Sequence, residues 1–146
     1  MKRTGILHRE LSDAVASLGH YDLVVLSDAG LPVPPAARRV ELALAPDLPG
    51  VPQVLEVLLQ EMLIEKVTRA SEQAMVSPRL HARIDDLLAG TPIEDVPHAE
   101  FRVLAATAKV HIRTGDFTPY ANLILTAGWI GRPTQAGRGD SEQETL

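Results

Sequence analysis

The sequence of 146 residues contains no cysteine and few aromatic residues: one Trp, two Tyr and two Phe. The lack of cysteine excludes disulfides, thiolate metal sites and cysteine nucleophiles. Because aromatic side chains are scarce, Leu, Val and Ala must build the hydrophobic core. No apolar run approaches the ~20 residues that span a membrane, and none follows the two basic residues near the N-terminus, as a signal peptide would require. We therefore expect a cytoplasmic protein.

Basic charge and general catalytic motifs are scarce as well. The formal net charge is −5, and the Lys and Arg residues are scattered along the chain, whereas a nucleic-acid partner needs a basic surface that neutralises phosphates. The sequence has no phosphate-binding glycine loop, no HExxH or GxSxG motif and no paired metal-ligand spacing. These absences predict no nucleic-acid or membrane partner, no metal and no cofactor, and they favour a small neutral ligand.

The chain does contain an alternation of amphipathic helices and short apolar strands. Apolar spacing and the positions of Gly and Pro predict helices over 8–18, 77–90 and 97–107, and strands over 22–28, 93–96, 109–115 and 122–128. Gly19 is expected to end the first helix in a left-handed conformation. The prolines within 29–35 predict a loop, because proline lacks the amide donor that a central strand needs.

Two further segments complete the predicted organisation. Residues 51–76 fit either a strand or a helix, and we favour a strand followed by a helix. From Gly131 onward the sequence is polar and without periodicity, which predicts a disordered tail over 131–146. The remaining residues, 1–130, are predicted to form one α/β domain in which helices cover a sheet.

His20 and Asp28 bracket the predicted strand 22–28. Ligands of open α/β sheets bind beyond the carboxyl ends of strands, which is where Asp28 falls, and a carboxylate there can accept hydrogen bonds from sugar hydroxyls. Asp28 can equally cap the turn that follows the strand. His20 comes after the end of a helix, where an imidazole can instead interact with the helix dipole.

His98 and Arg102 are four residues apart and therefore share one face of the helix that Pro97 opens. A His and an Arg with no acidic residue on the same face indicate ligand contact, although an exposed surface pair would show the same pattern. The other three histidines, His8, His81 and His111, are expected to have structural or surface roles.

Tyr120 and Asn122 alternate at strand spacing, so their side chains are expected to point to the same side. A Tyr ring beside a carboxamide is a common way to hold a sugar. The same pair is also common where a strand begins, so the pattern alone leaves both interpretations open.

Three blocks of the sequence resemble a known family: LGHYDLVVLSDAGLPVP (18–34), VPHAEFR (96–102) and TPYANLILTAG (118–128). Their order and separations are similar to those of the ribose pyranase and fucose mutarotase family over nearly all of residues 1–128, and specifically of its ribose branch. The fucose branch usually has His at the position of Gly30 and Gly at the position of Ala121. The resemblance implies a three-layer α/β/α fold with a central mixed sheet.

The resemblance also implies an activity, namely interconversion of the pyranose and furanose forms of D-ribose by general acid/base ring opening and closure, without a cofactor. A fucose-type mutarotase and a sugar-binding module without catalysis are the alternatives. Arg102 departs from the lysine that is usual at this position in the ribose branch. The implied proton donor is His20, and the implied sugar-binding residues are Asp28, His98, Arg102, Tyr120, Ala121 and Asn122.

The expected separation of His20 and Asp28 bears on assembly. If 22–28 is extended at ~3.3 Å per residue, the two side chains lie roughly 20 Å or more apart, which is too far for both to contact one pentose. Either the chain bends sharply after His20, or a neighbouring subunit completes the site. The family that this sequence resembles forms decamers of two stacked pentameric rings, which favours a shared site in a homodecamer.

Overall fold

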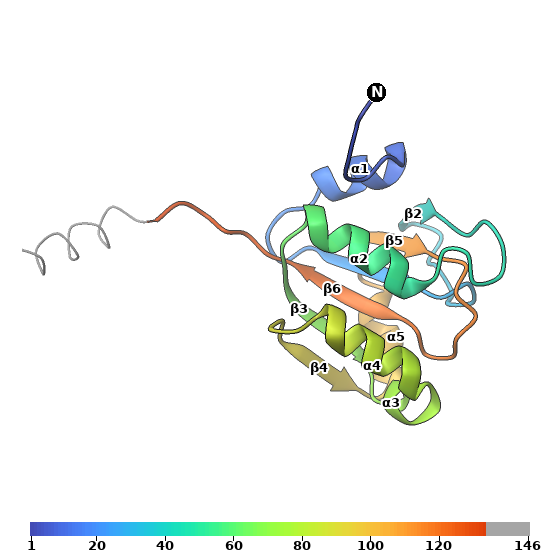
Figure 1. The fold of residues 1–146 in the computed structure, drawn as a ribbon. Helices are drawn as coiled ribbons and strands as arrows, with labels where there is room; N and C mark the ends of the chain where they lie inside the picture. Colours follow the sequence, from blue (N-terminus) through green and yellow to red (C-terminus); the bar gives the residue numbers. More distant parts are fainter. Residues whose placement is uncertain (134–146) are drawn as a thin grey trace, which may run out of the picture.

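The computed structural model describes residues 1–133 and places them around one six-stranded mixed sheet (Figure 1). The strand order is β2-β5-β1-β6-β3-β4. The strands are β1 (Leu23–Ser27), β2 (Arg38–Glu41), β3 (Ile64–Ala70), β4 (Ile93–Val96), β5 (Val110–Arg113) and β6 (Leu123–Ala127). The helices are α1 (Arg9–Ala16), α2 (Val51–Glu61), α3 (Glu72–Val76), α4 (Pro78–Leu87) and α5 (His98–Ala105).

Strand β6 runs antiparallel to both of its neighbours, whereas the other pairs in the sheet are parallel. The carboxyl end of β1 therefore meets the amino end of β6, with Leu26 opposite Leu123. Because β5 is parallel to β1, its carboxyl end lies at the same edge, with Arg113 opposite Ser27. Residues that follow β1 and β5 and precede β6 are thereby brought to one end of the sheet.

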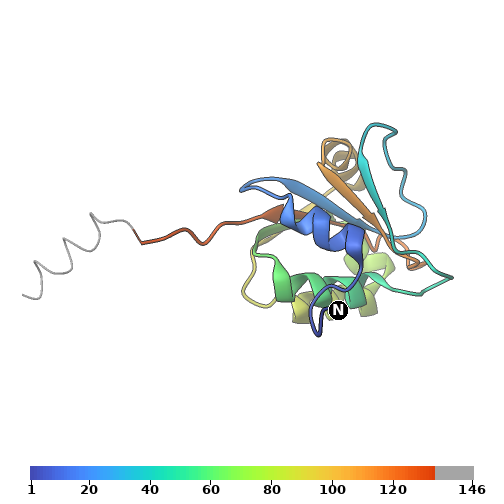
Figure 2. The ribbon, with the colours of Figure 1, turned by 90° about the horizontal axis from the view of Figure 1, so that it is seen from above.

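Helices cover both faces of the sheet, which confirms the predicted three-layer α/β/α arrangement. Leu11 of α1, Leu55 of α2 and Ile84 of α4 belong to the larger hydrophobic core on one face. Phe101 of α5 packs into a smaller core on the opposite face. In Figure 2, α5 (gold) lies on the other side of the strands from α2 and α4 (green). Among residues 1–133, no helix is both long and apolar enough to cross a lipid bilayer.

The predicted order of elements within 51–76 is wrong, because the helix α2 precedes the strand β3. The buried residues Val51, Val54, Leu55 and Leu58 follow helical spacing and face the core, and Pro52 lies in the first helical turn, where no intrahelical amide bond is lost. Strand β3 is buried over Val67–Ala70 between β4 and β6, so its run of buried residues does not alternate. The apolar residues of 51–76 are compatible with a helix and with a buried strand, and periodicity alone does not distinguish the two.

Other differences from the predicted elements are local. Strand β2 was not predicted, because it is an edge strand in which only Val40 is buried. Helix α1 ends earlier than expected, with Ser17 as its C-terminal cap in a right-handed conformation, and Tyr21 rather than Gly19 takes a positive φ. The predicted loop 29–35 is confirmed. Residues 131–133 form no helix or strand, and the rest of the predicted tail, 134–146, lies outside the described residues.

His111 is a polar residue in the core, lying on β5 with no solvent exposure. Neither of its ring nitrogens makes a hydrogen bond within the part of the chain that the structure describes. Burial lowers the pKa of His111, and the charge of Arg39 acts in the same direction. The folded protein therefore favours the neutral imidazole.

We predict that His111 makes the protein less stable in acid. The pKa of His111 in the folded state is below the unfolded value of about 6.5, so the unfolded chain binds more protons and stability falls as the pH drops below that value. Replacing His111→Leu should remove up to about 1.4 kcal/mol per pH unit of this dependence. Urea unfolding between neutral and mildly acidic pH measures it, and identical pH slopes for both proteins would contradict the assignment.

Candidate functional site

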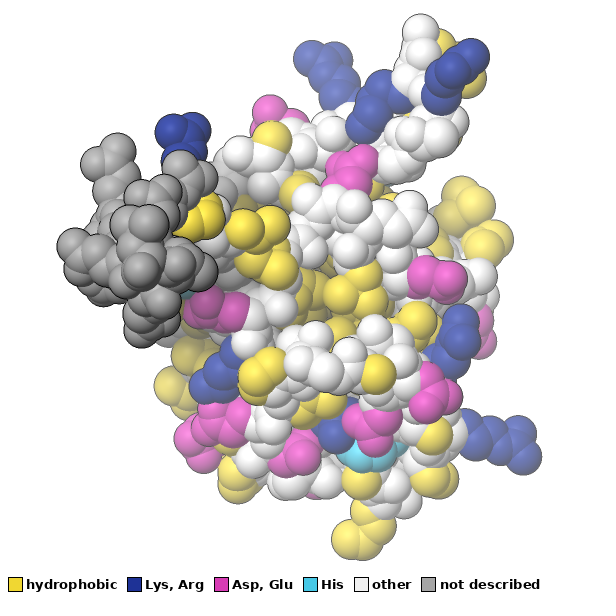
Figure 3. Space-filling model, turned by 60° about the vertical axis from the view of Figure 1, so that its left-hand side comes forward, with side chains coloured by type: hydrophobic (Ala, Val, Ile, Leu, Met, Phe, Trp, Pro, Cys, Tyr) yellow, Lys and Arg dark blue, Asp and Glu magenta, His cyan; other side chains and the backbone are white. Residues whose placement is uncertain are grey.

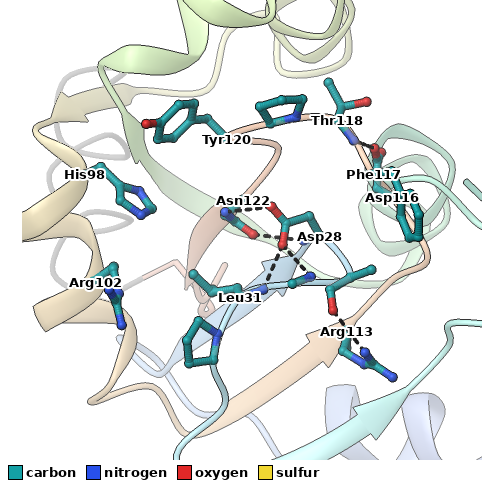
Figure 4. Close-up of a pocket in the computed structure, with 14 residues that line it drawn as sticks. Asp28, Leu31, His98, Arg102, Arg113, Asp116, Phe117, Thr118, Tyr120 and Asn122 are labelled. Carbon is teal, nitrogen blue, oxygen red and sulfur yellow. Dashed lines mark hydrogen bonds between the residues drawn. The ribbon is translucent and has the colours of Figure 1, made fainter. Parts of the chain in front are cut away.

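A pocket of about 790 Å³ opens where β1 and β5 end and β6 begins. Helix α5 supplies one wall, and the loops after β1 and β5 supply the others (Figure 4). The lining residues are Asp28, Ala29, Gly30, Leu31, Pro32, His98, Arg102, Arg113, Asp116, Phe117, Thr118, Pro119, Tyr120 and Asn122.

Asp28 occupies the centre of the pocket in a fixed orientation. Its Oδ1 accepts hydrogen bonds from the backbone N–H groups of Gly30 at 2.9 Å and Leu31 at 2.8 Å. The carboxylate therefore caps the turn and also lines the pocket. The turn-capping and the ligand-binding interpretations of Asp28 are compatible with each other. Its Oδ2 receives a single long hydrogen bond within the described structure, from Asn122 at 3.3 Å, and keeps capacity for a ligand hydroxyl.

Asn122 is joined to Asp28 by a reciprocal pair of hydrogen bonds across the sheet. Besides the contact of its Nδ2 with the carboxylate, its Oδ1 accepts the backbone N–H of Asp28 at 2.8 Å. These bonds fix the amide orientation of Asn122, which is 4% exposed. Figure 4 shows the two side chains facing each other at the middle of the pocket.

Tyr120 also lines the pocket, although it does not lie on a strand. Strand β6 begins only at Leu123, and Tyr120 has a positive φ of 58° in the preceding turn. The predicted strand alternation of Tyr120 and Asn122 is therefore wrong, because the turn rather than the pleat of a strand directs the tyrosine ring.

His98 and Arg102 lie on the α5 wall, one turn apart. The His98 ring stands edge-on to Tyr120 with centroids 5.1 Å apart. Its backbone N–H donates to both carboxylate oxygens of Glu72 at 3.1 Å. Desolvation raises the pKa of Glu72, but hydrogen bonds from Ser71 and from this N–H outweigh it and lower the pKa overall. Among residues 1–133, no carboxylate pairs with the exposed guanidinium of Arg102.

Two polar residues of the pocket, Arg113 and Asp116, were not predicted from the sequence. Arg113 binds Glu41 through Nε at 2.7 Å and a terminal nitrogen at 2.8 Å, and its other terminal nitrogen donates to the Ala29 carbonyl at 2.9 Å. The hydrogen bonds from Arg113 lower the pKa of Glu41. The position of Arg113 at the carboxyl end of a strand is the signal that could have identified it.

Asp116 organises the loop between β5 and β6. Its Oδ2 accepts the backbone N–H of Val51 at 2.8 Å, and its Oδ1 accepts that of Thr118 at 2.8 Å. Its own carbonyl accepts the N–H of Ala29 at 2.9 Å. The residue is 4% exposed, so these bonds form away from water and hold the two pocket loops to the start of α2.

His20 and Ala121 do not line the pocket. His20 precedes β1, at the opposite end of that strand from Asp28. Its Nε2 lies 2.8 Å from a carboxylate oxygen of Glu65, and its ring stacks on Tyr21 with centroids 3.7 Å apart. Ala121 is fully buried and packs in the larger hydrophobic core.

The pocket is rich in hydrogen-bonding groups for an uncharged polar ligand. Asp28, Asn122, His98 and Tyr120 all line it, and they provide a carboxylate, a carboxamide, an imidazole and a phenol. Within residues 1–133, no three His, Asp or Glu side chains gather as a metal site would require.

Comparisons with known proteins agree on one family. A family model described as the RbsD / FucU transport protein family matches residues 1–130. A protein of Variovorax paradoxus named D-ribose pyranase is 49% identical, with 88% of this chain and 98% of that protein covered. A Chloroflexus aggregans protein of the same name is 44% identical, with 89% and 99% covered. The solved structure of Bacillus subtilis RbsD complexed with D-ribose is 43% identical, covers 90% of this chain and 100% of its own, and has a TM-score of 0.86.

We predict that Gly115→Ala destabilises the protein. A Cβ at this position would lie 2.4 Å from the Ala45 carbonyl oxygen and 2.7 Å from that of Leu48, both of which are backbone atoms. The loop must shift, at an expected cost of about 1–3 kcal/mol in the free energy of unfolding. Gly19→Ala is the control, since its nearest contact is a side chain at 3.6 Å. Equal unfolding midpoints for the two variants would contradict the prediction.

Proposed function

The chain belongs to the RbsD / FucU transport protein family, and from this premise we propose that it is an isomerase that interconverts the pyranose and furanose forms of D-ribose. The observation that carries the proposal is the convergence of Asp28, His98, Tyr120 and Asn122 in one pocket. The pocket lies on a backbone that matches the ribose-bound relative over 90% of this chain and 100% of the relative.

The pocket supplies the contacts that a free pentose needs. Asp28 Oδ2 accepts hydrogen bonds from sugar hydroxyls, and the fixed amide of Asn122 keeps that oxygen oriented. His98 and Tyr120 close one side with two rings that also carry polar atoms. We assign Arg102 a contact at the rim of the same wall. Ala121 is assigned a supporting role, because its buried methyl fixes the backbone between Tyr120 and Asn122.

We assign His20 as the acid/base group of the reaction. Opening a hemiacetal ring requires a proton at the ring oxygen and loss of a proton from the anomeric hydroxyl, and closure through a different hydroxyl gives the other ring size. Imidazole suits both transfers near neutral pH. Glu65 can only accept, so the Nε2 of His20 carries the proton in their 2.8 Å contact, which leaves Nδ1 to exchange a proton with the sugar.

The proposed site is shared between subunits. The chain turns at Tyr21, which has a positive φ, but His20 and Asp28 still lie at opposite ends of β1. The five residues of this strand alone span roughly 17 Å, which is more than the width of one pentose. A single sugar can contact both only if His20 comes from a second copy of the chain. We therefore propose the homodecamer of two pentameric rings as the active form, with the His20–Glu65 pair of one subunit closing the pocket of its neighbour.

Exposed apolar side chains near His20 support such an interface. Tyr21, Trp129 and Ile130 are 69%, 72% and 87% exposed, and the Trp129 ring lies 6.4 Å from that of His20. Figure 3 shows that hydrophobic side chains also reach the surface on this face of the molecule, with basic and acidic side chains between them. Apolar surface of this kind commonly marks contacts between proteins.

We also propose a cytoplasmic location. The absence of cysteine shows that the chain needs no disulfide, and the proposed substrate is a free sugar that cells take up and metabolise internally.

The activity is tested by magnetisation-transfer NMR on D-ribose, with L-fucose as the comparison sugar. The wild-type protein should speed pyranose–furanose exchange of ribose more than anomer exchange of fucose. Replacing His20→Gln should lower the ribose rate about 100-fold or more, because general acid/base catalysis is lost, and Glu65→Gln should lower it less.

Glu56→Gln is the matched control, because Glu56 is an exposed residue of α2 away from the pocket. Its exchange rate should equal that of the wild type. A wild-type rate in His20→Gln would contradict the assignment of His20. If the wild-type protein speeds the exchange of fucose more than that of ribose, the assignment of the substrate is contradicted.

A further inference from the structure

Two side chains outside the pocket hold the backbone of the turn that carries Tyr120. Gln73 of α3 donates from Nε2 to the Tyr120 carbonyl at 2.8 Å. Ser77, between α3 and α4, donates from its hydroxyl to the Pro119 carbonyl at 2.7 Å. Neither side chain lines the pocket. The carbonyls of Pro119 and Tyr120 are thus both hydrogen-bonded to side chains at α3 and its C-terminal end.

The conformation of Tyr120 depends on such anchors. Its φ of 58° lies in the left-handed region, which disfavours any residue with a Cβ and persists only where surrounding contacts impose it. The Gln73 side chain is fully buried, so water does not compete for its bond to the Tyr120 carbonyl. The same turn sets the ring of Tyr120 against His98 at a centroid distance of 5.1 Å.

The orientation of the Gln73 amide is itself determined by His81. The His81 Nδ1 lies 3.0 Å from Gln73 Oε1, and since an amide oxygen only accepts, His81 donates and Nε2 of Gln73 is directed at Tyr120. His81 is followed by Asp85, with 3.5 Å between Nε2 and Oδ2, and Asp85 binds the buried Arg69 of β3 at 2.7 Å. Polar side chains from β3 and α4 therefore lie in sequence behind the pocket turn, and the hydrogen bonds from His81 to Gln73 and from Gln73 to Tyr120 are the part that reaches it.

We propose that Gln73 is a positioning residue for sugar binding, and that it acts by holding Tyr120 in its left-handed conformation with an amide oriented by His81. The inference rests on the proposed ribose isomerase activity, because it assigns Tyr120 a contact with the sugar. It adds a determinant of substrate affinity that lies outside the pocket and touches no substrate.

Two substitutions of Gln73 test this role by removing the hydrogen bond to Tyr120 in different ways. Gln73→Met keeps the size of the side chain and removes both hydrogen bonds. Gln73→Glu keeps an acceptor for His81 but places a carboxylate oxygen against the Tyr120 carbonyl. Both remove the hydrogen bond to the Tyr120 carbonyl, and the loss of that buried bond should raise the KM for ribose about tenfold, while kcat changes less. Met75→Ala on the same helix is the control, since Met75 is 85% exposed, and its KM should equal that of the wild type.

A second measurement observes Tyr120 directly. The chain has only two tyrosines, Tyr21 and Tyr120, so 3-fluorotyrosine labelling gives two ¹⁹F signals that Tyr21→Phe assigns. Gln73→Met should shift or broaden the Tyr120 signal and leave that of Tyr21 unchanged. If Gln73→Met does not fold, Gln73→Glu and Ser77→Ala provide the same measurements on the same turn.

A double-mutant cycle tests the link to His81. His81→Leu should raise KM in the same direction by a smaller factor, and the double variant with Gln73→Met should be no worse than Gln73→Met alone. A wild-type KM and unchanged Tyr120 signal in Gln73→Met or Gln73→Glu would overturn the inference, and additive effects would overturn the role of His81. If the wild-type protein fails to catalyse exchange, the proposed function fails instead, and the ¹⁹F spectra still decide whether Gln73 positions Tyr120.

Discussion

The reversed direction of β6 is the constraint on which the rest of the structure depends. Inserted antiparallel between β1 and β3, this strand brings its own start beside the end of β1, so that Asp28 and Asn122 meet although 94 positions separate them. Their reciprocal hydrogen bonds fix the centre of the pocket. Arg113 reaches the same edge because β5 runs parallel to β1. The order and direction of the strands therefore determine which side chains can meet in the pocket.

Much of the fold was predictable because its signals are local. Apolar runs, prolines at helix starts and glycines at helix ends predicted most of the helices and strands. Their alternation predicted the α/β class. The order of α2 and β3 was not predictable in this way, because an apolar segment such as 51–62 fits a helix or a buried strand until packing decides between them. Strand β2 was missed for the opposite reason, since Val40 is its only buried residue and an edge strand carries little apolar pattern.

The pocket was predictable only in part, for a related reason. Asp28, His98 and Asn122 flank elements that the sequence predicts, so their positions at element ends were visible. Arg113 and Asp116 gain their roles from Glu41 and Val51, and Gln73 gains its role from Tyr120. Each of these contacts joins segments that are distant in the chain, so a local sequence pattern cannot predict it. The separation of His20 from the pocket, in contrast, follows directly from the length of one strand.

The central claim is that His20 and Asp28 act on one sugar from different chains, and subunit complementation tests it most directly. His20→Gln and Asp28→Asn should each be inactive alone. When the two variants are unfolded together and refolded as mixed oligomers, random assembly should give about a quarter of the sites both native residues, so ribose exchange should return to about a quarter of the wild-type rate. Mixed oligomers that remain as inactive as either parent would contradict the claim.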